Sequence, residues 1–157
     1  QLNVAPHHHL YSLGYFHNAG LVLLAQHYTD FEQVLKTSYA SANEYTHSEQ
    51  QHWGVDHAYV GYRLAQGWQL SPYLASAIRH HHQATQILSD PEFSSQVKAY
   101  VAVLTLAEYL LAVSAAWADE FTDKQWQRCG DMVQHYLGLH AQQMAEFQQQ
   151  AAALLME

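Results

Sequence analysis

The longest apolar stretch of this sequence, VAVLTLAEYLLAVSAAWA at residues 101–118, constrains the fold more than any other feature. It is long enough to cross a membrane as a helix. However, Thr105, Glu108 and Ser114 interrupt it with polar groups, which are costly to place in lipid. We therefore expect this stretch to be the buried central helix of a helical bundle, with a membrane span as the less favoured alternative.

The rest of the chain also has helical patterning. No segment shows sustained alternation of apolar and polar residues, and seven Gly and three Pro leave few breaks. Asp30, Asp56, Ser71-Pro72 and Asp90-Pro91 are typical helix starts. The sequence thus predicts an all-α fold of about seven to eight helices. The expected helices are Leu10–His27, Phe31–Ala42, Asn43–Trp53, His57–Gln66, Pro72–His82, a long helix from Pro91 towards Trp117, Asp123–Gly138 and His140–Met156.

Charge and composition exclude some classes of function. Six Lys and Arg against fourteen Asp and Glu give a net charge of −8, so no large basic face is available for nucleic acid or for an anionic membrane. The 157 residues are 49% hydrophobic, as expected for one folded domain. The single cysteine, Cys129, excludes an internal disulfide and fits a cytoplasmic protein. The chain starts at Gln1 and shows no secretory signal.

Histidine is the unusual component, with thirteen residues. It is the commonest metal ligand in proteins, although it is also common on surfaces. The candidate positions are the pair His17-Asn18, His57 and the run His80–His82. His57 alone is more simply interpreted as a structural histidine, and a histidine run at a helix C-terminus is favoured by the helix dipole. Successive helical side chains differ by about 100° around the axis, so at least one of the run must point inward. We assign no chemistry to His7–His9, a surface tract.

Glu108 is the most informative single acid. Leu104, Ala107 and Leu111 surround it at helical spacing, so its face is expected to be inward. Because an unpaired buried carboxylate is costly, Glu108 should have a cation, a histidine or a metal as partner. The alternative is a narrow polar stripe that faces solvent. No Gly-rich phosphate loop, paired-cysteine motif or Gly-x-Ser-x-Gly elbow is present.

Taken in order, these segments resemble the HDOD domain, a signalling branch of the HD phosphohydrolase superfamily. The resemblance covers about Leu10–Ser114. It rests on SLGYFHNAGLVLL, on EQQHWGVDHAYVGYRLAQGW with Glu49 and Asp56-His57, on WQLSPYLASAIRHHH, and on Ala107-Glu108. It implies an HD-domain-like helical bundle, a single domain over residues 1–157 that forms the C-terminal half of a longer HDOD protein.

The resemblance also implies a set of metal-ligand positions, with His80 outside it. Two departures weaken the site. Asn18 replaces an aspartate and offers one neutral oxygen. The chain also begins too close to His17 to contain the family's upstream histidine. We therefore expect a remnant site that is empty or binds a divalent transition metal weakly, with no catalytic residue and no cofactor. The matching positions are His17, Asn18, His57, His81, His82 and Glu108.

Three functions stay open at this point. The first is a non-catalytic regulatory module of bacterial signal transduction that contacts an unidentified protein or small ligand, with its oligomeric state, including a homo-oligomer, left open. The second is a metal-dependent phosphohydrolase that acts on a nucleotide or a cyclic dinucleotide phosphodiester. The third is a structural helical fragment that depends on a missing half. We favour the first, because Asn18 is a poor metal ligand.

Overall fold

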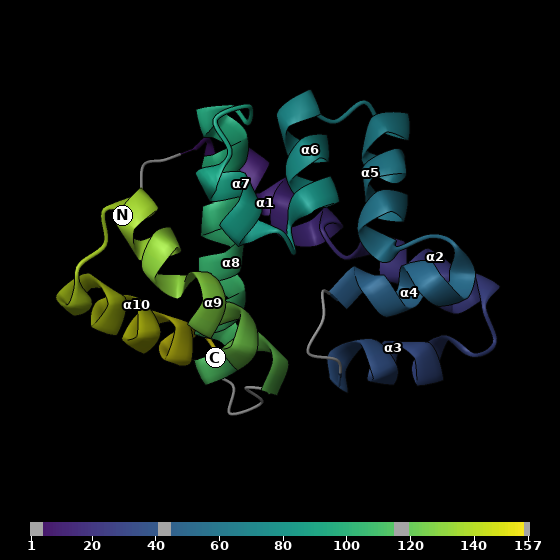
Figure 1. The fold of residues 1–157 in the computed structure, drawn as a ribbon. Coiled ribbons are helices and arrows are strands. Elements are labelled where there is room, and N and C mark those ends of the chain that lie inside the picture. The colour runs from purple at the N-terminus through teal and green to yellow at the C-terminus, as the bar shows by residue number, and fades with distance from the viewer. Residues whose placement is uncertain (1–4, 41–44, 115–119, 156–157) are drawn as a thin grey trace. The chain divides into compact units, whose positions relative to one another are not determined.

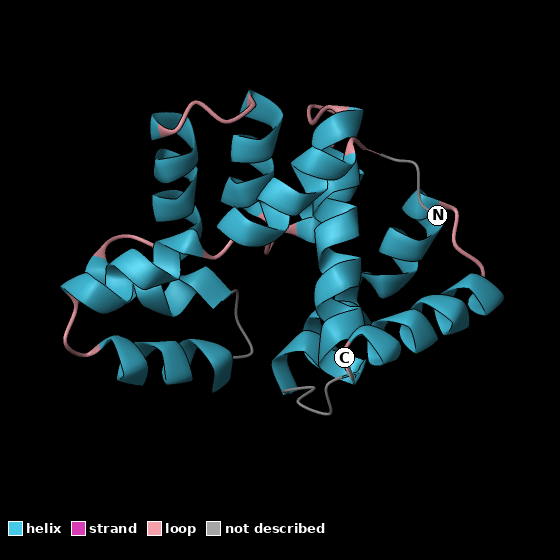
Figure 2. Cartoon of the chain, turned by 180° about the vertical axis from the view of Figure 1, so that it is seen from behind, coloured by secondary structure: helices cyan, strands magenta, loops and turns pink. Residues whose placement is uncertain are grey.

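A computed structural model describes residues 5–40, 45–114 and 120–155, and over these residues the fold is all-α without strands, as predicted (Figures 1 and 2). The helices are α1 His7–Phe16, α2 Ala19–His27, α3 Phe31–Ala40, α4 Tyr45–Trp53, α5 His57–Gly67, α6 Pro72–His80, α7 Ala84–Ser89, α8 Ser95–Ser114, α9 Glu120–Leu137 and α10 Ala141–Leu154.

The chain divides into two compact units, one of which is Ala5–Gln83. In this unit α5 packs against both α2 and α6, α1 packs against α6, and α3 packs against α4. The other unit contains α7 to α10, with α8 packed against α7, α9 and α10. The single domain over residues 1–157 stays a prediction.

The prediction of one continuous helix over Leu10–His27 was wrong, because the chain breaks at His17-Asn18. Asn18 has φ −102° and ψ 10°, which lies outside the helical region, and it forms the N-cap position of α2. Asparagine favours helix ends over helix interiors. The break also lets α2 approach α5 closely, since a side chain at Gly20 would overlap the backbone carbonyl of His57. The pair His17-Asn18 therefore lies at a junction between helices.

The capping signals were only partly correct. Asp56 caps α5 as predicted, because its side chain accepts a 2.7 Å hydrogen bond from the amide of Tyr59. Pro72 begins α6, although the Ser71 side chain makes no cap hydrogen bond. Asp90 instead closes a turn by accepting from the amide of Glu92, and α8 begins later, where the Ser94 hydroxyl accepts from the amide of Val97. Trp117, the expected end of this helix, lies outside the described residues.

Helix α8 is the core helix of its unit. Tyr100, Val101 and Ala102 are fully buried, and Val97 and Leu106 are nearly so. Among the described residues α8 is the one helix with the length and apolar composition of a membrane span, and 50% of it is buried inside the structure. A buried core helix of a globular protein meets the same two criteria.

Candidate functional site

Three histidines of the Ala5–Gln83 unit converge in its interior. His57 is the first residue of α5, and His81 and His82 directly follow α6. One ring nitrogen from each lies within 4.8 Å of the other two. His57 is 4% exposed and His81 is 1% exposed. The local cause is the Asp56 cap, which starts α5 at His57, together with the end of α6 at His80.

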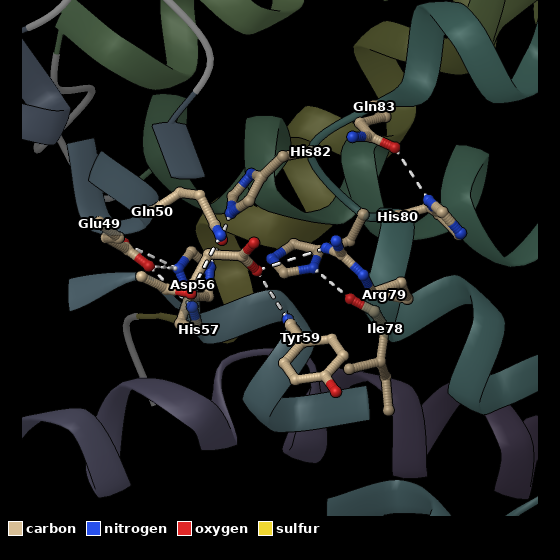
Figure 3. A network of polar contacts seen from close by, with 12 residues as sticks. Glu49, Gln50, Asp56, His57, Tyr59, Ile78, Arg79, His80, His82 and Gln83 are labelled. Carbon is tan, nitrogen blue, oxygen red and sulfur yellow. Dashed lines mark hydrogen bonds and ion pairs between the residues drawn. The ribbon is translucent and has the colours of Figure 1, made fainter. Parts of the chain in front are cut away.

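Glu49, from α4, holds His57 in place (Figure 3). Its two carboxylate oxygens lie 2.9 and 2.8 Å from Nδ1 of His57, and one of them also accepts from the His57 amide at 2.7 Å. Glu49 is 1% exposed, so this pair is buried. A carboxylate only accepts, so Nδ1 of His57 carries a proton, and in the neutral imidazole Nε2 presents its lone pair.

Two further histidines are fixed in the same tautomer. Nδ1 of His81 donates to the carbonyl of Ile78 at 2.8 Å, and Nδ1 of His17 donates to the carbonyl of Gly14 at 2.9 Å. The rings of His17 and His81 meet edge to face, with centroids 5.5 Å apart. In both residues, as in His57, Nε2 is then the acceptor nitrogen when the imidazole is neutral.

His82 completes the cluster. Its Nε2 lies 2.9 Å from Nε2 of His57, which is a hydrogen-bond distance (Figure 3). When His57 is neutral its Nε2 accepts, and the proton of this bond then belongs to His82. The hydrogen-bond network thus assigns tautomers to His17, His57, His81 and His82.

Two members of the cluster, His81 and His82, resist protonation. Burial lowers the pKa of His81 well below its usual value, and the neighbouring His57 and His17 lower it further. Burial likewise lowers the pKa of His82 well below the usual value, with His81 and then His57 adding to the effect. Both side chains are therefore neutral near pH 7, the form in which imidazole binds metals.

The donor atoms fit a divalent transition metal. Buried Nε2 of His81 and buried Oδ1 of Asn18 have no hydrogen-bond partner. Tetrahedral zinc with Zn–N bonds of about 2.0–2.1 Å separates its ligand nitrogens by about 3.3 Å. The nitrogens of His57, His81 and His82 already lie within 4.8 Å of one another. Imidazole nitrogen suits zinc, copper, nickel and iron. A metal-bound histidine commonly donates its other ring N–H to a carboxylate, as His57 does to Glu49.

The structure therefore brings together three of the six predicted ligand positions, His57, His81 and His82, and places His17 beside them. Asn18 adds a buried oxygen at the α1–α2 junction. Glu108 belongs to the other unit, where it adds to the effect of burial in raising the pKa of Cys129 to about 11. Its pairing with a histidine stays a prediction. Glu49 was not among the predicted site residues, although an acid eight residues before His57 could have been recognised as a partner of that histidine.

Comparison with known families agrees with the boundaries of this unit. The model of the HDOD domain family matches residues 1–84, which contain His17, Asn18, Glu49, His57 and the whole histidine run. No curated protein and no solved structure matches the chain.

Proposed function

Since the chain belongs to the HDOD domain family and is thereby related to the HD superfamily, we propose that it is a non-catalytic regulatory module of signal transduction. In this proposal it acts through contacts with a protein or a small ligand in the bacterial cytoplasm. The observation that carries the proposal is the Asn18 amide at the buried α1–α2 junction, where an HD enzyme has a carboxylate.

The chemistry of the cluster supports this role. Metal-assisted hydrolysis of a phosphodiester commonly uses carboxylate oxygens to hold or bridge cations. His57, His81 and His82 offer only neutral nitrogen, and Asn18 offers an uncharged oxygen. Two buried carboxylates lie beside the cluster, and both are already engaged. Glu49 contacts His57 through both oxygens, and Asp56 accepts from the Tyr59 amide and pairs with Arg79. The cluster therefore offers no free carboxylate that could hold or bridge a cation.

This polar cluster also fixes the shape of the unit. Glu49 joins α4 to the start of α5, and the His57–His82 bond joins α5 to the segment after α6. Buried hydrogen bonds such as the Glu49–His57 and His57–His82 contacts fix the segments that they join in one arrangement. A rigid helical unit of this kind is suited to present a constant binding surface to a partner.

The second candidate function is a metal-dependent phosphohydrolase, and the shared tautomer of His17, His57 and His81 favours it. When bound, a divalent metal would supply Lewis-acid chemistry. His57, His81 and His82 would hold it. Glu49 would keep the His57 ring oriented through Nδ1, which is a positioning role.

Calorimetric titration with Zn²⁺ and Mn²⁺, together with turnover of bis(p-nitrophenyl) phosphate and a cyclic dinucleotide, tests the two functions. Surface histidines contribute unrelated metal binding, so the titration uses a chain with His7–His9, of which His7 and His8 are exposed, changed to Gln. We expect weak or no metal binding and no turnover. Tight stoichiometric metal that is lost in His81→Gln, together with turnover of either substrate, would overturn the regulatory proposal.

A further inference from the structure

A cleft between α5 and α6 has a lining that differs chemically from the histidine cluster. It has a volume of about 550 Å³, within the range of small-molecule sites. Leu70, Pro72 and Ala75 give it apolar walls, and its polar lining consists of the side chains of Tyr59, Tyr62, Gln66, Ser76, Arg79 and His80.

Three polar groups of this cleft, on Tyr59, Tyr62 and Arg79, are available as donors. The hydroxyl of Tyr59 accepts from Nη1 of Arg63 at 3.1 Å, and the hydroxyl of Tyr62 accepts from Nε2 of Gln66 at 2.7 Å. Each phenol oxygen thus receives one hydrogen bond, and its own proton is what it offers to a ligand. Arg79 adds a guanidinium group, which has donors only.

Arg79 is held in position rather than free to move. Its Nη1 lies 3.3 Å from Oδ1 of Asp56, and its guanidinium lies 5.6 Å from the centroid of the Tyr59 ring. Figure 3 shows Asp56 in contact with both Arg79 and the backbone amide of Tyr59. The Arg79 side chain is 31% exposed while that of Asp56 is 6% exposed, so the cation and not the acid faces solvent. A prepositioned guanidinium suits carboxylate and phosphate groups.

The side chains that line the cleft include an arginine and no acidic residue, whereas the chain as a whole is acidic. The protein has fourteen acidic residues, yet none of them lines this cleft. Arg79 lines it and Arg63 contacts Tyr59 beside it, so two of only six Lys and Arg residues meet at one ring. Small anions are otherwise repelled by a protein of net charge −8.

We propose that the α5–α6 cleft binds a small organic anion. Arg79 and the hydroxyls of Tyr59 and Tyr62 would contact a phosphate or carboxylate group, and Leu70 and Pro72 would cover a flat apolar body. This site goes beyond the proposed regulatory function and does not depend on it. None of the three clustered histidines, His57, His81 and His82, lines the cleft.

The test is a titration of the ¹⁵N-labelled chain, followed by NMR, with phenyl phosphate, phenylacetate and the neutral 2-phenylethanol. We expect saturable shifts in α5 and α6 with the two anions and none with the alcohol. The tighter of the two anions identifies the preferred charged group. Tyr62→Phe and Arg79→Lys should each weaken anion binding by about 10-fold, the effect of losing a hydrogen bond to a charged group.

Matched variants separate a site from general charge attraction. Arg63→Gln should weaken binding, because the Tyr59 hydroxyl loses the hydrogen bond that it accepts from Arg63. This variant keeps the Asp56–Arg79 pair, so it still tests the site if Arg79→Lys fails to fold. Lys36→Gln removes the same charge from α3 and should leave affinity unchanged. Equal binding of 2-phenylethanol, an equal loss in Lys36→Gln, or full affinity in Tyr62→Phe and Arg63→Gln would each overturn the proposal.

Discussion

Glu49 and His57 are joined by three hydrogen-bond contacts, two to the ring Nδ1 and one to the backbone amide. One side chain thus fixes the tautomer of a histidine and also satisfies an amide at the start of α5. The chain between them turns at Gly54, whose φ of 71° favours glycine. This connection positions the whole histidine cluster relative to α4.

Glu49→Ala should destabilise the fold, because it leaves two donors of His57 buried without an acceptor. We expect a loss of about 1–3 kcal/mol in the free energy of unfolding, measured by urea denaturation. Glu32→Ala is the control, since Glu32 forms an exposed pair with Lys36 and should change stability by less than about 0.5 kcal/mol. Equal effects of the two substitutions would show that the Glu49–His57 pair has no special role.

Stability should fall in mild acid because of His81 and His82. Their folded pKa values lie well below 6.5, whereas the unfolded side chains titrate near 6.5. Below that pH the unfolded chain binds protons that the folded chain does not, so stability is lost as pH falls and is constant in this respect above it. Urea midpoints from pH 7.5 to 5 measure the slope. His81→Gln should flatten the slope and His8→Gln, an exposed change, should not.

Asn18→Asp should raise the affinity for Zn²⁺, Mn²⁺ or Fe²⁺, since it places a charged oxygen where the neutral Oδ1 is buried. Without metal, the same change should lower stability, because a buried carboxylate without a partner is costly. Hydrolysis of phosphodiesters should still not appear. Calorimetric titration of both forms, with His7–His9 replaced, gives the comparison. An unchanged affinity would mean that the Asn18 position does not share a metal site with the histidines.

Gly20→Ala should be strongly destabilising, since the added methyl group would overlap the His57 carbonyl and approach the Gly61 amide. Backbone atoms cannot move aside as flexible side chains do, so we expect a loss of about 3 kcal/mol or more. Gly14→Ala is the matched control, because open space surrounds that position within α1. It should raise stability by roughly 0.5–1 kcal/mol. Thermal unfolding of both variants measures the contrast, and similar midpoints would contradict the close α2–α5 contact.

Glu108 is expected to interact with at least one of His17, His57, His81 and His82. If it does, Glu108→Leu should cost about 1–3 kcal/mol by leaving a buried histidine without its partner. A double-mutant cycle of Glu108→Gln with His82→Gln measures the coupling directly. A coupling energy of zero in this cycle, and in the same cycle with His17, His57 and His81, would exclude Glu108 from the cluster.

The all-α fold was predictable because the signals were local. Caps such as Asp56 and the absence of alternating segments depend on neighbouring residues only. The start of α8 was less predictable, since Asp90 and Ser94 are both good caps and the sequence does not say which one begins the helix. The break at His17-Asn18 was missed for a different reason. It accompanies a close helix–helix approach at Gly20, which no short window of sequence reveals.

The residue types of the candidate site were predictable from the sequence, but the hydrogen bonds between them were not. The order of the histidine segments pointed to His57, His81 and His82, and the structure brings these together. The tautomers depend on which acceptor each Nδ1 meets, namely Glu49, the Ile78 carbonyl and the Gly14 carbonyl. Those partners follow from helix ends and helix packing. The donor-lined α5–α6 cleft likewise needs the packing of two helices and has no sequence motif.

The single thiol of this protein offers a reporter of one unit alone. Cys129 is 2% exposed and its pKa is raised to about 11, so only about one molecule in ten thousand carries a thiolate at pH 7. Alkylating reagents should reach it when the α7–α10 unit opens, because unfolding restores both access and acidity. The rate of alkylation, compared with the rate at which the cluster of His57, His81 and His82 comes apart on unfolding, would therefore show whether the two units unfold together or one after the other.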